Sequence, residues 1–169
     1  MPSVAPTYEL SAGLSGYVAG IIDGEGCISI NRARFRNKPW LSDRYTAILS
    51  VGNTSRQMIE LLVSTFGGTI ALRPATAKHK ACYVWSVRGP KAKAVLDAVG
   101  PHLRVKVAQR DLLIEFVRDF RSFKGGAYPR IRAPRVSTDE LERRKRIWLA
   151  IKALNRPGPS SSGLDRVLL

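Results

Sequence analysis

A chain of 169 residues is long enough for one domain with a hydrophobic core, and its 44% hydrophobic content excludes a disordered polypeptide. It carries 28 Lys and Arg residues against 13 Asp and Glu, which gives a formal net charge of +15. So large a surplus in a small folded chain predicts a polyanionic partner, because neutralising phosphates releases their condensed counterions. On charge alone, a ribosomal or merely adhesive basic protein explains the composition equally well.

The cysteines and the first apolar run bear on where the protein works. Cys27 and Cys82 lie in strand-like apolar stretches and are too few for a disulfide framework, so we expect core residues in a reducing compartment. The apolar run at 14–22 is too short to span a membrane, and it lacks the basic flank of a signal peptide. We therefore expect an intracellular protein, in the cytoplasm or nucleoid of a prokaryote or in an organelle, and not a secreted one.

The first half of the chain predicts two helices around a pair of strands. Apolar spacing predicts a helix over 10–22 that ends at a stop signal, Asp23-Gly24-Glu25-Gly26. Strand-like stretches follow at 27–36 and 44–51. Asn53-Thr54-Ser55 then caps a helix over 56–66, which Gly67-Gly68 ends.

The second half predicts another strand pair and three further helices. The strands lie at 69–73 and 81–88, and the helices at 91–99, 105–120 and 137–155, the last opened by a Ser-x-x-Glu capping box. This order predicts an α+β fold, a mixed α/β layer in which one four-stranded sheet has helices on one face. The free face is a surface on which a DNA duplex can lie. We expect a loose arm at 1–8, a single domain at 9–156 and a flexible tail at 157–169.

The first predicted helix contains three glycines. Gly16 and Gly20 share one helix face, with Gly13 nearby, and each glycine costs about 1 kcal/mol relative to alanine. The cost is understandable if the bare face lets another helix approach at backbone distance. The apolar side chains of this helix then pack into the core of the subunit: Leu14, Tyr17, Val18, Ile21 and Ile22.

Two acids sit between glycines where this helix is expected to end. A chain can turn sharply there and expose a carboxylate together with a backbone carbonyl, both of them hard oxygen ligands suited to Mg²⁺. From spacing alone, however, an ordinary helix followed by an Asp/Gly turn is the better interpretation.

The stretch from Val18 to Gly26 closely resembles, without a gap, the motif that names the LAGLIDADG homing endonucleases. The resemblance implies the αββαββα fold of that family, with an antiparallel DNA-binding sheet. It also implies that Glu25 binds the catalytic metal, that the Gly24 carbonyl is a second ligand and that Asp23 is structural. The implied cofactor is Mg²⁺, with Mn²⁺ able to substitute.

The chain holds a single copy of this motif, so a second active site requires a second subunit. The resemblance therefore implies a C₂ homodimer with Gly13, Gly16 and Gly20 at its interface, and a roughly palindromic target.

The resemblance extends to three supporting residues. The segment 101–109 resembles the one in which single-motif members place a lysine near the scissile phosphate, and Lys106 matches it. The alternative is a solvated lysine at a helix start. Asn53 stands where family members carry a polar residue that orders water, although it is shorter than their usual glutamine and also suits a helix cap. Either Gln57 or Arg56 matches the basic or polar partner of that residue.

Basic and small polar residues on the predicted strands and turns form a candidate DNA-binding set. Its members are Ser29, Asn31, Arg32, Arg34, Arg36, Arg44, Thr46, Ser50, Arg73, Lys78, Lys80 and Arg88. Strand parity leaves a conflict, because Arg32, Arg34 and Arg36 share a face with Ile28 and Ile30 in an uninterrupted strand. A bulge, or a strand that runs beyond the core, resolves it.

Together these features predict a site-specific homing endonuclease that makes a staggered double-strand break in a long, pseudo-palindromic DNA target. The resemblance implies that such proteins are encoded within introns or inteins. The alternative is a catalytically inactive protein of the same fold, an intron maturase or a DNA-binding regulator. A basic ribosomal or ribonucleoprotein component is a further alternative.

Overall fold

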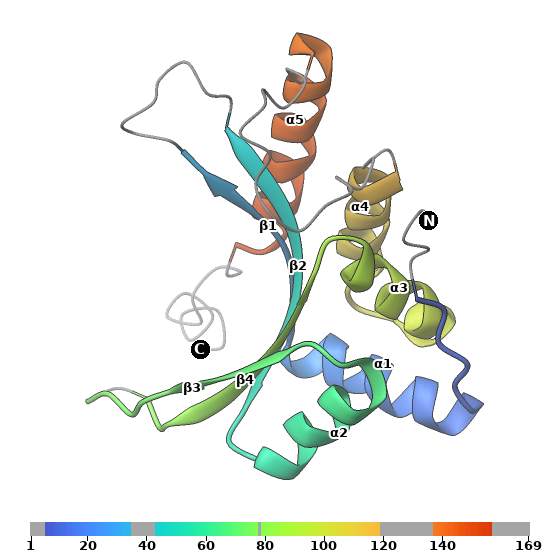
Figure 1. Ribbon diagram of the computed structural model, residues 1–169, viewed down its shortest axis with the longest axis vertical. Coiled ribbons are helices and arrows are strands. Elements are labelled where there is room, and N and C mark those ends of the chain that lie inside the picture. The colour runs from blue at the N-terminus through green and yellow to red at the C-terminus, as the bar shows by residue number, and fades with distance from the viewer. Residues whose placement is uncertain (1–5, 35–42, 78, 119–136, 157–169) are drawn as a thin grey trace, which may run out of the picture.

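The computed structural model describes residues 6–34, 43–77, 79–118 and 137–156 (Figure 1). Within these ranges the elements are α1 (Ala12–Glu25), β1 (Gly26–Ala33), β2 (Arg44–Asn53), α2 (Arg56–Phe66), β3 (Thr69–Arg73), β4 (Cys82–Arg88), α3 (Pro90–Val99), a 3₁₀ turn (Gly100–His102), α4 (Val107–Arg118) and α5 (Thr138–Leu154). No helix in the described ranges is long and apolar enough to cross a membrane.

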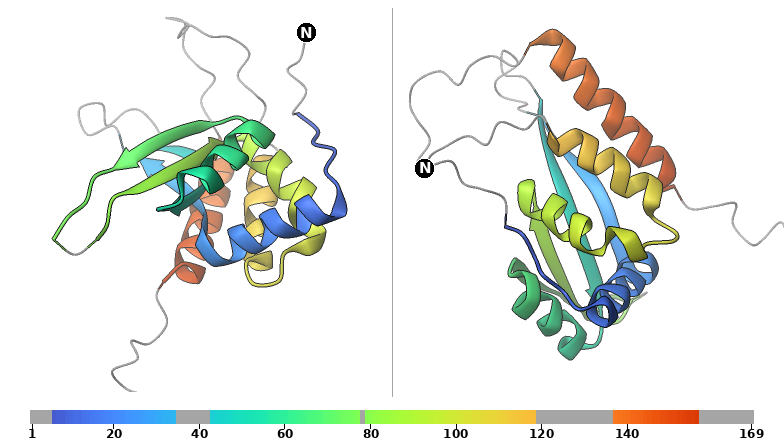
Figure 2. Two further views of the ribbon diagram at one scale, coloured as in Figure 1. Left: turned by 90° about the horizontal axis from the view of Figure 1, so that it is seen from below. Right: turned by 90° about the vertical axis from the view of Figure 1, so that its right-hand side faces the viewer.

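The strands form one antiparallel sheet in the order β1-β2-β4-β3. Each hairpin supplies two neighbouring strands, and the two hairpins join where β2 pairs with β4. The helices cover one face of this sheet and leave the other face uncovered by helices (Figure 2). The predicted α+β class, with a four-stranded antiparallel sheet and one free face, is confirmed.

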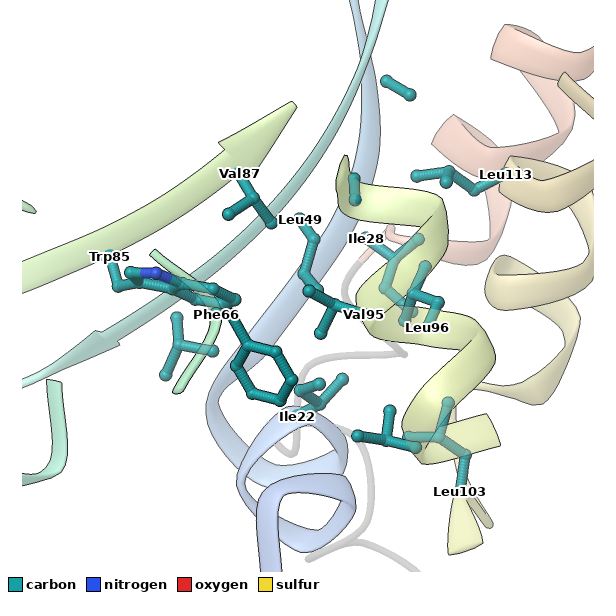
Figure 3. Close-up of a cluster of buried hydrophobic side chains, with 14 of the residues drawn as sticks. Ile22, Ile28, Leu49, Phe66, Trp85, Val87, Val95, Leu96, Leu103 and Leu113 are labelled. Carbon is teal, nitrogen blue, oxygen red and sulfur yellow. The ribbon is translucent and has the colours of Figure 1, made fainter. Parts of the chain in front are cut away.

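The core lies between the covered face of the sheet and the helices. Alternate residues of β2 are buried, as expected for a strand with one face inside, and Leu49 and Val51 are fully buried. Figure 3 shows Leu49 and Trp85 from the sheet, with Ile22, Phe66 and Leu96 from the helices, directed into one cluster.

Helix α1 departs from the prediction at its C-terminal end. It runs through Asp23 and Gly24 to Glu25, so a stop at Asp23 is wrong. Gly26 is the first residue outside the helix, and its N–H donates to the Ile22 carbonyl. A Cβ at Gly26 would lie 2.5 Å from that carbonyl oxygen, so only glycine permits this close junction of helix and strand.

Tyr17 and Cys27 also lie elsewhere than predicted. Tyr17 is 52% exposed on the outer side of α1, because its neighbours Val18 and Ile21 occupy the face that turns to the core. Cys27 is exposed on the free face of the sheet, since the alternation of β1 directs Ile28 inward. Cys82 is only half-buried.

The two ends of the described domain are tied to the sheet and helices. The Tyr8 hydroxyl donates to the Phe66 carbonyl at 3.0 Å, and the two rings meet edge to face. Tyr8 therefore packs with the domain, although we expected it in the N-terminal arm. At the other end, the Asn155 side chain donates to the Ile28 carbonyl at 2.8 Å and fixes the end of α5 against β1.

The turn that ends α2 depends on a buried indole. Gly67 and Gly68 both have positive φ, and a Cβ at Gly68 would lie 2.8 Å from Trp85 Nε1. The Trp85 ring is fully buried, and its N–H donates to the Gly67 carbonyl at 2.7 Å.

Trp85→Phe is expected to lower the free energy of unfolding by about 1–3 kcal/mol, because it leaves the Gly67 carbonyl without its donor. Urea unfolding followed by circular dichroism measures the change. Leu149→Ala, at a position that is 48% exposed, is the control and is expected to stay within about 0.5 kcal/mol of the wild type. Equal effects of the two variants would contradict this account of the turn.

Candidate active site and sheet surface

Glu25 is the last residue of α1 and stands at one end of the sheet. Gly26 pairs with Val51, so the residues that follow Val51, Gly52 and Asn53, lie beside the end of α1. The Glu25 side chain is exposed, and among the described residues it has no hydrogen-bond or ion-pair partner. It is a carboxylate available to a ligand from outside the subunit.

Asp23 joins α1 to the segment before α4. Its carboxylate accepts hydrogen bonds from the backbone N–H groups of Arg104, at 2.7 Å, and Lys106, at 2.9 Å. Burial tends to raise the pKa of Asp23, but the backbone donors of 104–106 and the Lys106 charge outweigh it and hold the pKa below its ordinary value. The expected structural role of Asp23 has a geometric basis in these contacts.

Lys106 also links these two segments, with its side chain as the donor and backbone carbonyls of α1 as the acceptors. Its ammonium group donates to the Ile22 carbonyl at 2.9 Å and also to the Asp23 carbonyl. The Asp23 carbonyl lies in the last turn, where carbonyls lack partners within the helix, whereas the Ile22 carbonyl also accepts from the Gly26 N–H. A cation there also meets the negative end of the helix dipole. We call this reciprocal pair, Asp23 and Lys106, the α1 clamp. It brings a positive charge to the helix turn that carries Glu25.

Asp23→Asn is expected to lower the free energy of unfolding at pH 7 by about 1–3 kcal/mol, because an amide cannot match both N–H donors. A depressed folded-state pKa contributes stability above the ordinary value of 3.8, and this contribution is lost as pH falls through the folded pKa. The difference between wild type and variant should therefore shrink below pH 3.8. Urea unfolding across pH measures it, and a difference that does not change with pH would contradict the clamp.

The predicted water-ordering residues lie at the same end of the sheet. Asn53 ends β2, and its side-chain oxygen accepts from Ser55 N–H at 2.7 Å, while Ser55 itself caps α2. Gln57 is exposed in the first turn of α2. Arg56, the other candidate, pairs with Glu60 at 2.7 Å. Gln57 is therefore the freer of the two candidates for the second role.

Strand register aligns polar residues in rows across the free face. The rows are Asn31–Thr46, Ser29–Ile48–Arg88, Cys27–Ser50–Ser86–Thr69 and Gly52–Val84–Ala71. Arg44 and Arg73 lie at the ends of the same face, opposite Ala33 and Cys82 respectively. None of these residues is acidic. The result is a surface whose interior mixes neutral polar side chains such as Asn31 and Ser50 with apolar ones such as Ile48 and Val84, and whose rim carries arginines.

The remaining basic residues of the predicted set do not lie on the free face together. Arg32 lies on the helix-covered side, where its guanidinium pairs with Asp43 and stands 5.0 Å from the Trp148 ring centroid. The continuous register of β1 excludes a bulge between 26 and 33, so α5 rather than a bulge resolves the conflict of parity at Arg32. Arg34 and Lys80 are exposed beyond the strand ends. Arg36 and Lys78 lie outside the described residues.

Three residues of the row Cys27–Ser50–Ser86–Thr69 were absent from the sequence-based set. Ser86 and Thr69 face each other across β4 and β3, with their hydroxyl oxygens 3.0 Å apart, and Cys27 stands in the same row. Pairing between β2 and β4 creates this row. The alternation of β4 alone places the side chains of Ser86 and Trp85 on opposite faces of the sheet. It does not show which residues of the neighbouring strands lie beside Ser86.

The outer side of α1 carries a stripe of small residues. Gly13, Gly20 and Gly24 are exposed, and a Cβ built on any of them meets no described residue within 4 Å. Gly16 is half-buried near His102, and Tyr17 lies on the same side. The subunit itself therefore gives no packing reason for glycine at 13, 20 and 24.

The residues present fit a hard divalent cation in their chemistry. The Glu25 carboxylate and the Gly24 carbonyl are oxygen donors at the end of one helix. Within the described ranges, no three His, Cys, Asp or Glu side chains gather into a metal-binding group. A cation at Glu25 would therefore take its other ligands from water, from a phosphate or from another subunit.

No protein-family model and no curated protein sequence matches this chain. Solved structures do resemble it. The archaeal intron-encoded homing endonuclease I-Vdi141I, solved with DNA, aligns at a TM-score of 0.67 and 18% identity over 92% of each chain. The homing endonuclease I-CvuI, solved with DNA and Mg, aligns at a TM-score of 0.65 and 16% identity over 87% of this chain and 84% of that one.

This chain also aligns with about half of a longer solved structure. The LAGLIDADG homing endonuclease I-SmaMI, solved bound to cleaved DNA, has a TM-score of 0.57 and 17% identity, with 92% of this chain covered but 47% of I-SmaMI. The arrangement of helices and sheet in this chain is the LAGLIDADG homing endonuclease fold.

Proposed function

We propose that this chain is a single-motif LAGLIDADG homing endonuclease that makes a staggered double-strand break at a long, pseudo-palindromic DNA site. The observation that carries this proposal is the position of Glu25. It is an exposed carboxylate beside the α1 clamp, at the end of a sheet whose free face carries polar side chains and lacks acids. Such a protein acts where DNA is found, in the cytoplasm or nucleoid of a prokaryote or in an organelle.

The free face provides the DNA-binding surface in this proposal. Neutral side chains such as Ser29, Asn31 and Thr46 suit hydrogen bonds to base edges, and the rim arginines suit phosphates. The net charge of +15 favours the same partner through counterion release. The related structures of I-Vdi141I and I-CvuI were both solved with DNA.

Glu25 and the Gly24 carbonyl would hold the divalent metal, Mg²⁺ or Mn²⁺. When bound, such an ion supplies an acidified water and neutralises charge on the leaving oxygen. Glu25 is the last residue of α1, and the clamp contacts of Asp23 and Lys106 tie that last helix turn to the segment before α4. Lys106 adds positive charge near the position of the scissile phosphate, while Asn53 and Gln57 order water beside it.

Cutting both strands requires two such centres, and one chain supplies one Glu25. In the proposed homodimer, the small-residue stripe of α1 lies against the same stripe of a second copy. Glycines at 13, 20 and 24 let the two helix backbones approach closely. The coverage of about half of I-SmaMI by this chain agrees with two copies doing the work of one longer protein.

Cleavage of a plasmid library that carries randomised DNA inserts tests the activity. We expect Mg²⁺ to permit selective linearisation of a subset of plasmids and EDTA to prevent it. Sequencing of the cut ends then identifies the target and the stagger. Specific binding without cleavage would support an inactive protein of this fold, a maturase or a DNA-binding regulator, and would overturn the enzyme proposal.

A further inference from the structure

A basic groove runs along the outer edge of the sheet, between β1 and the C-terminal end of α5. It is lined by Ser29, Ile30, Trp148, Ile151, Lys152, Asn155 and Arg156. We infer that this groove, which we call the β1–α5 groove, holds the DNA phosphate backbone through Lys152 and Arg156. The inference rests on the proposed function, and it extends DNA contact from the sheet to a helix on the covered side.

Contacts of the end of α5 with β1 and with the core hold the two walls of the groove together. The Asn155 amide donates to the Ile28 carbonyl on the open edge of β1, at 2.8 Å. Ile151, one turn earlier, is buried in the core. These contacts fix the last turns of α5 against β1, so the positions of Lys152 and Arg156 relative to the sheet edge are set by the fold.

The groove has largely apolar walls with two basic residues, and none of its described lining residues is acidic. Lys152 Nζ lies 5.2 Å from the Trp148 ring centroid, and the Arg32 guanidinium approaches the same ring at 5.0 Å. Arg32 is paired with Asp43, whereas neither Lys152 nor Arg156 forms an ion pair within the described residues. Two cations, Lys152 in the last turn of α5 and Arg156 just beyond the end of that helix, therefore remain for an anion from outside.

The groove is continuous with the free face of the sheet. Ser29 lines the groove and also begins the row Ser29–Ile48–Arg88 on that face. Strands about 4.8 Å apart place the outer strands of a four-stranded sheet about 14 Å from each other, more than the roughly 12 Å width of the major groove. The sheet edge outside β1, where α5 ends, should therefore lie near a phosphate backbone, while the free face of β1 still points to base edges.

The test is the salt dependence of binding to a mixed-sequence DNA duplex, which reports phosphate contacts without knowledge of the target. The test variant is Lys152→Gln with Arg156→Gln. Its matched control is Lys145→Gln with Arg146→Gln, which removes the same charge from exposed positions of α5 that do not line the groove. Fluorescence anisotropy over a salt series gives the slope of log Kd against log salt.

We expect the groove variant to reduce the slope by about 3.6, since the proposed homodimer loses two phosphate contacts in each subunit at about 0.9 per contact, and the control to leave it near the wild-type value. A wild-type slope for the groove variant, or equal losses in both variants, would overturn the inference alone. Failure of the wild type to bind any duplex would overturn the proposed function as well. If the double variant does not fold, Arg156→Gln alone should reduce the slope by about 1.8, since one contact is lost in each subunit of the dimer.

Discussion

Glu25→Gln is expected to slow cleavage of the selected target by about 10³-fold or more, because the variant loses an anionic metal ligand whose ion contributes several kcal/mol. The amide keeps the size of the side chain but carries no charge. Glu25 is exposed and has no partner among the described residues, so the free energy of unfolding should stay within about 0.5 kcal/mol of the wild type. DNA affinity and oligomeric state should be unchanged.

Single-turnover cleavage in Mg²⁺ provides the measurement, with duplex binding and light scattering on the same preparations. Glu9→Gln is the matched control, since Glu9 is an exposed glutamate outside the candidate site. It should cleave at the wild-type rate. Glu25→Gln with the wild-type rate would show that this carboxylate is not the metal ligand.

Gly20→Leu is expected to abolish the dimer and, with it, double-strand cleavage. Overpacking costs about 1–3 kcal/mol per site, and a two-fold contact contains the substitution twice. The dimer Kd should therefore rise between roughly 30-fold and 10⁴-fold. Within the subunit the same change is harmless, because no described residue lies within 4 Å of a Cβ at Gly20 and leucine favours a helix by about 0.5–1 kcal/mol over glycine.

These opposite effects make the variant informative. Light scattering should show a monomer whose thermal unfolding is unchanged or raised, and the library assay should show no linear product. Ala153→Leu adds similar bulk at an exposed position of α5 and should remain dimeric and active. A Gly20→Leu protein that stays dimeric and cuts would place the interface elsewhere.

Local patterns predicted most elements well, because their determinants are near in sequence. The helix at 56–66 and the strand at 69–73 have the predicted bounds, since a capping serine begins that helix and two glycines of positive φ end it. The end of α1 was not predictable in this way. The donors to the Asp23 carboxylate come from Arg104 and Lys106, more than 80 positions further along the chain.

The candidate site was predicted in its residue types more fully than in its geometry. The motif identified Asp23 and Glu25, the segment 101–109 identified Lys106, and the structure brings the three to one helix end. The covered position of Arg32 depends on Trp148 of α5, a contact that strand parity cannot reveal. The exposure of Cys27 follows from parity with Ile28, yet hydrophobic composition favoured the core.

The central claim, that each subunit contributes one Glu25 to cut one strand, is tested most directly by mixing subunits. Wild type and Glu25→Gln are refolded together at equal amounts, and the tagged heterodimer is purified and given the supercoiled plasmid target. The account predicts nicked circles, with a single strand cut and little linear product. Linear product at the wild-type rate, or no cleavage of either strand, would contradict it.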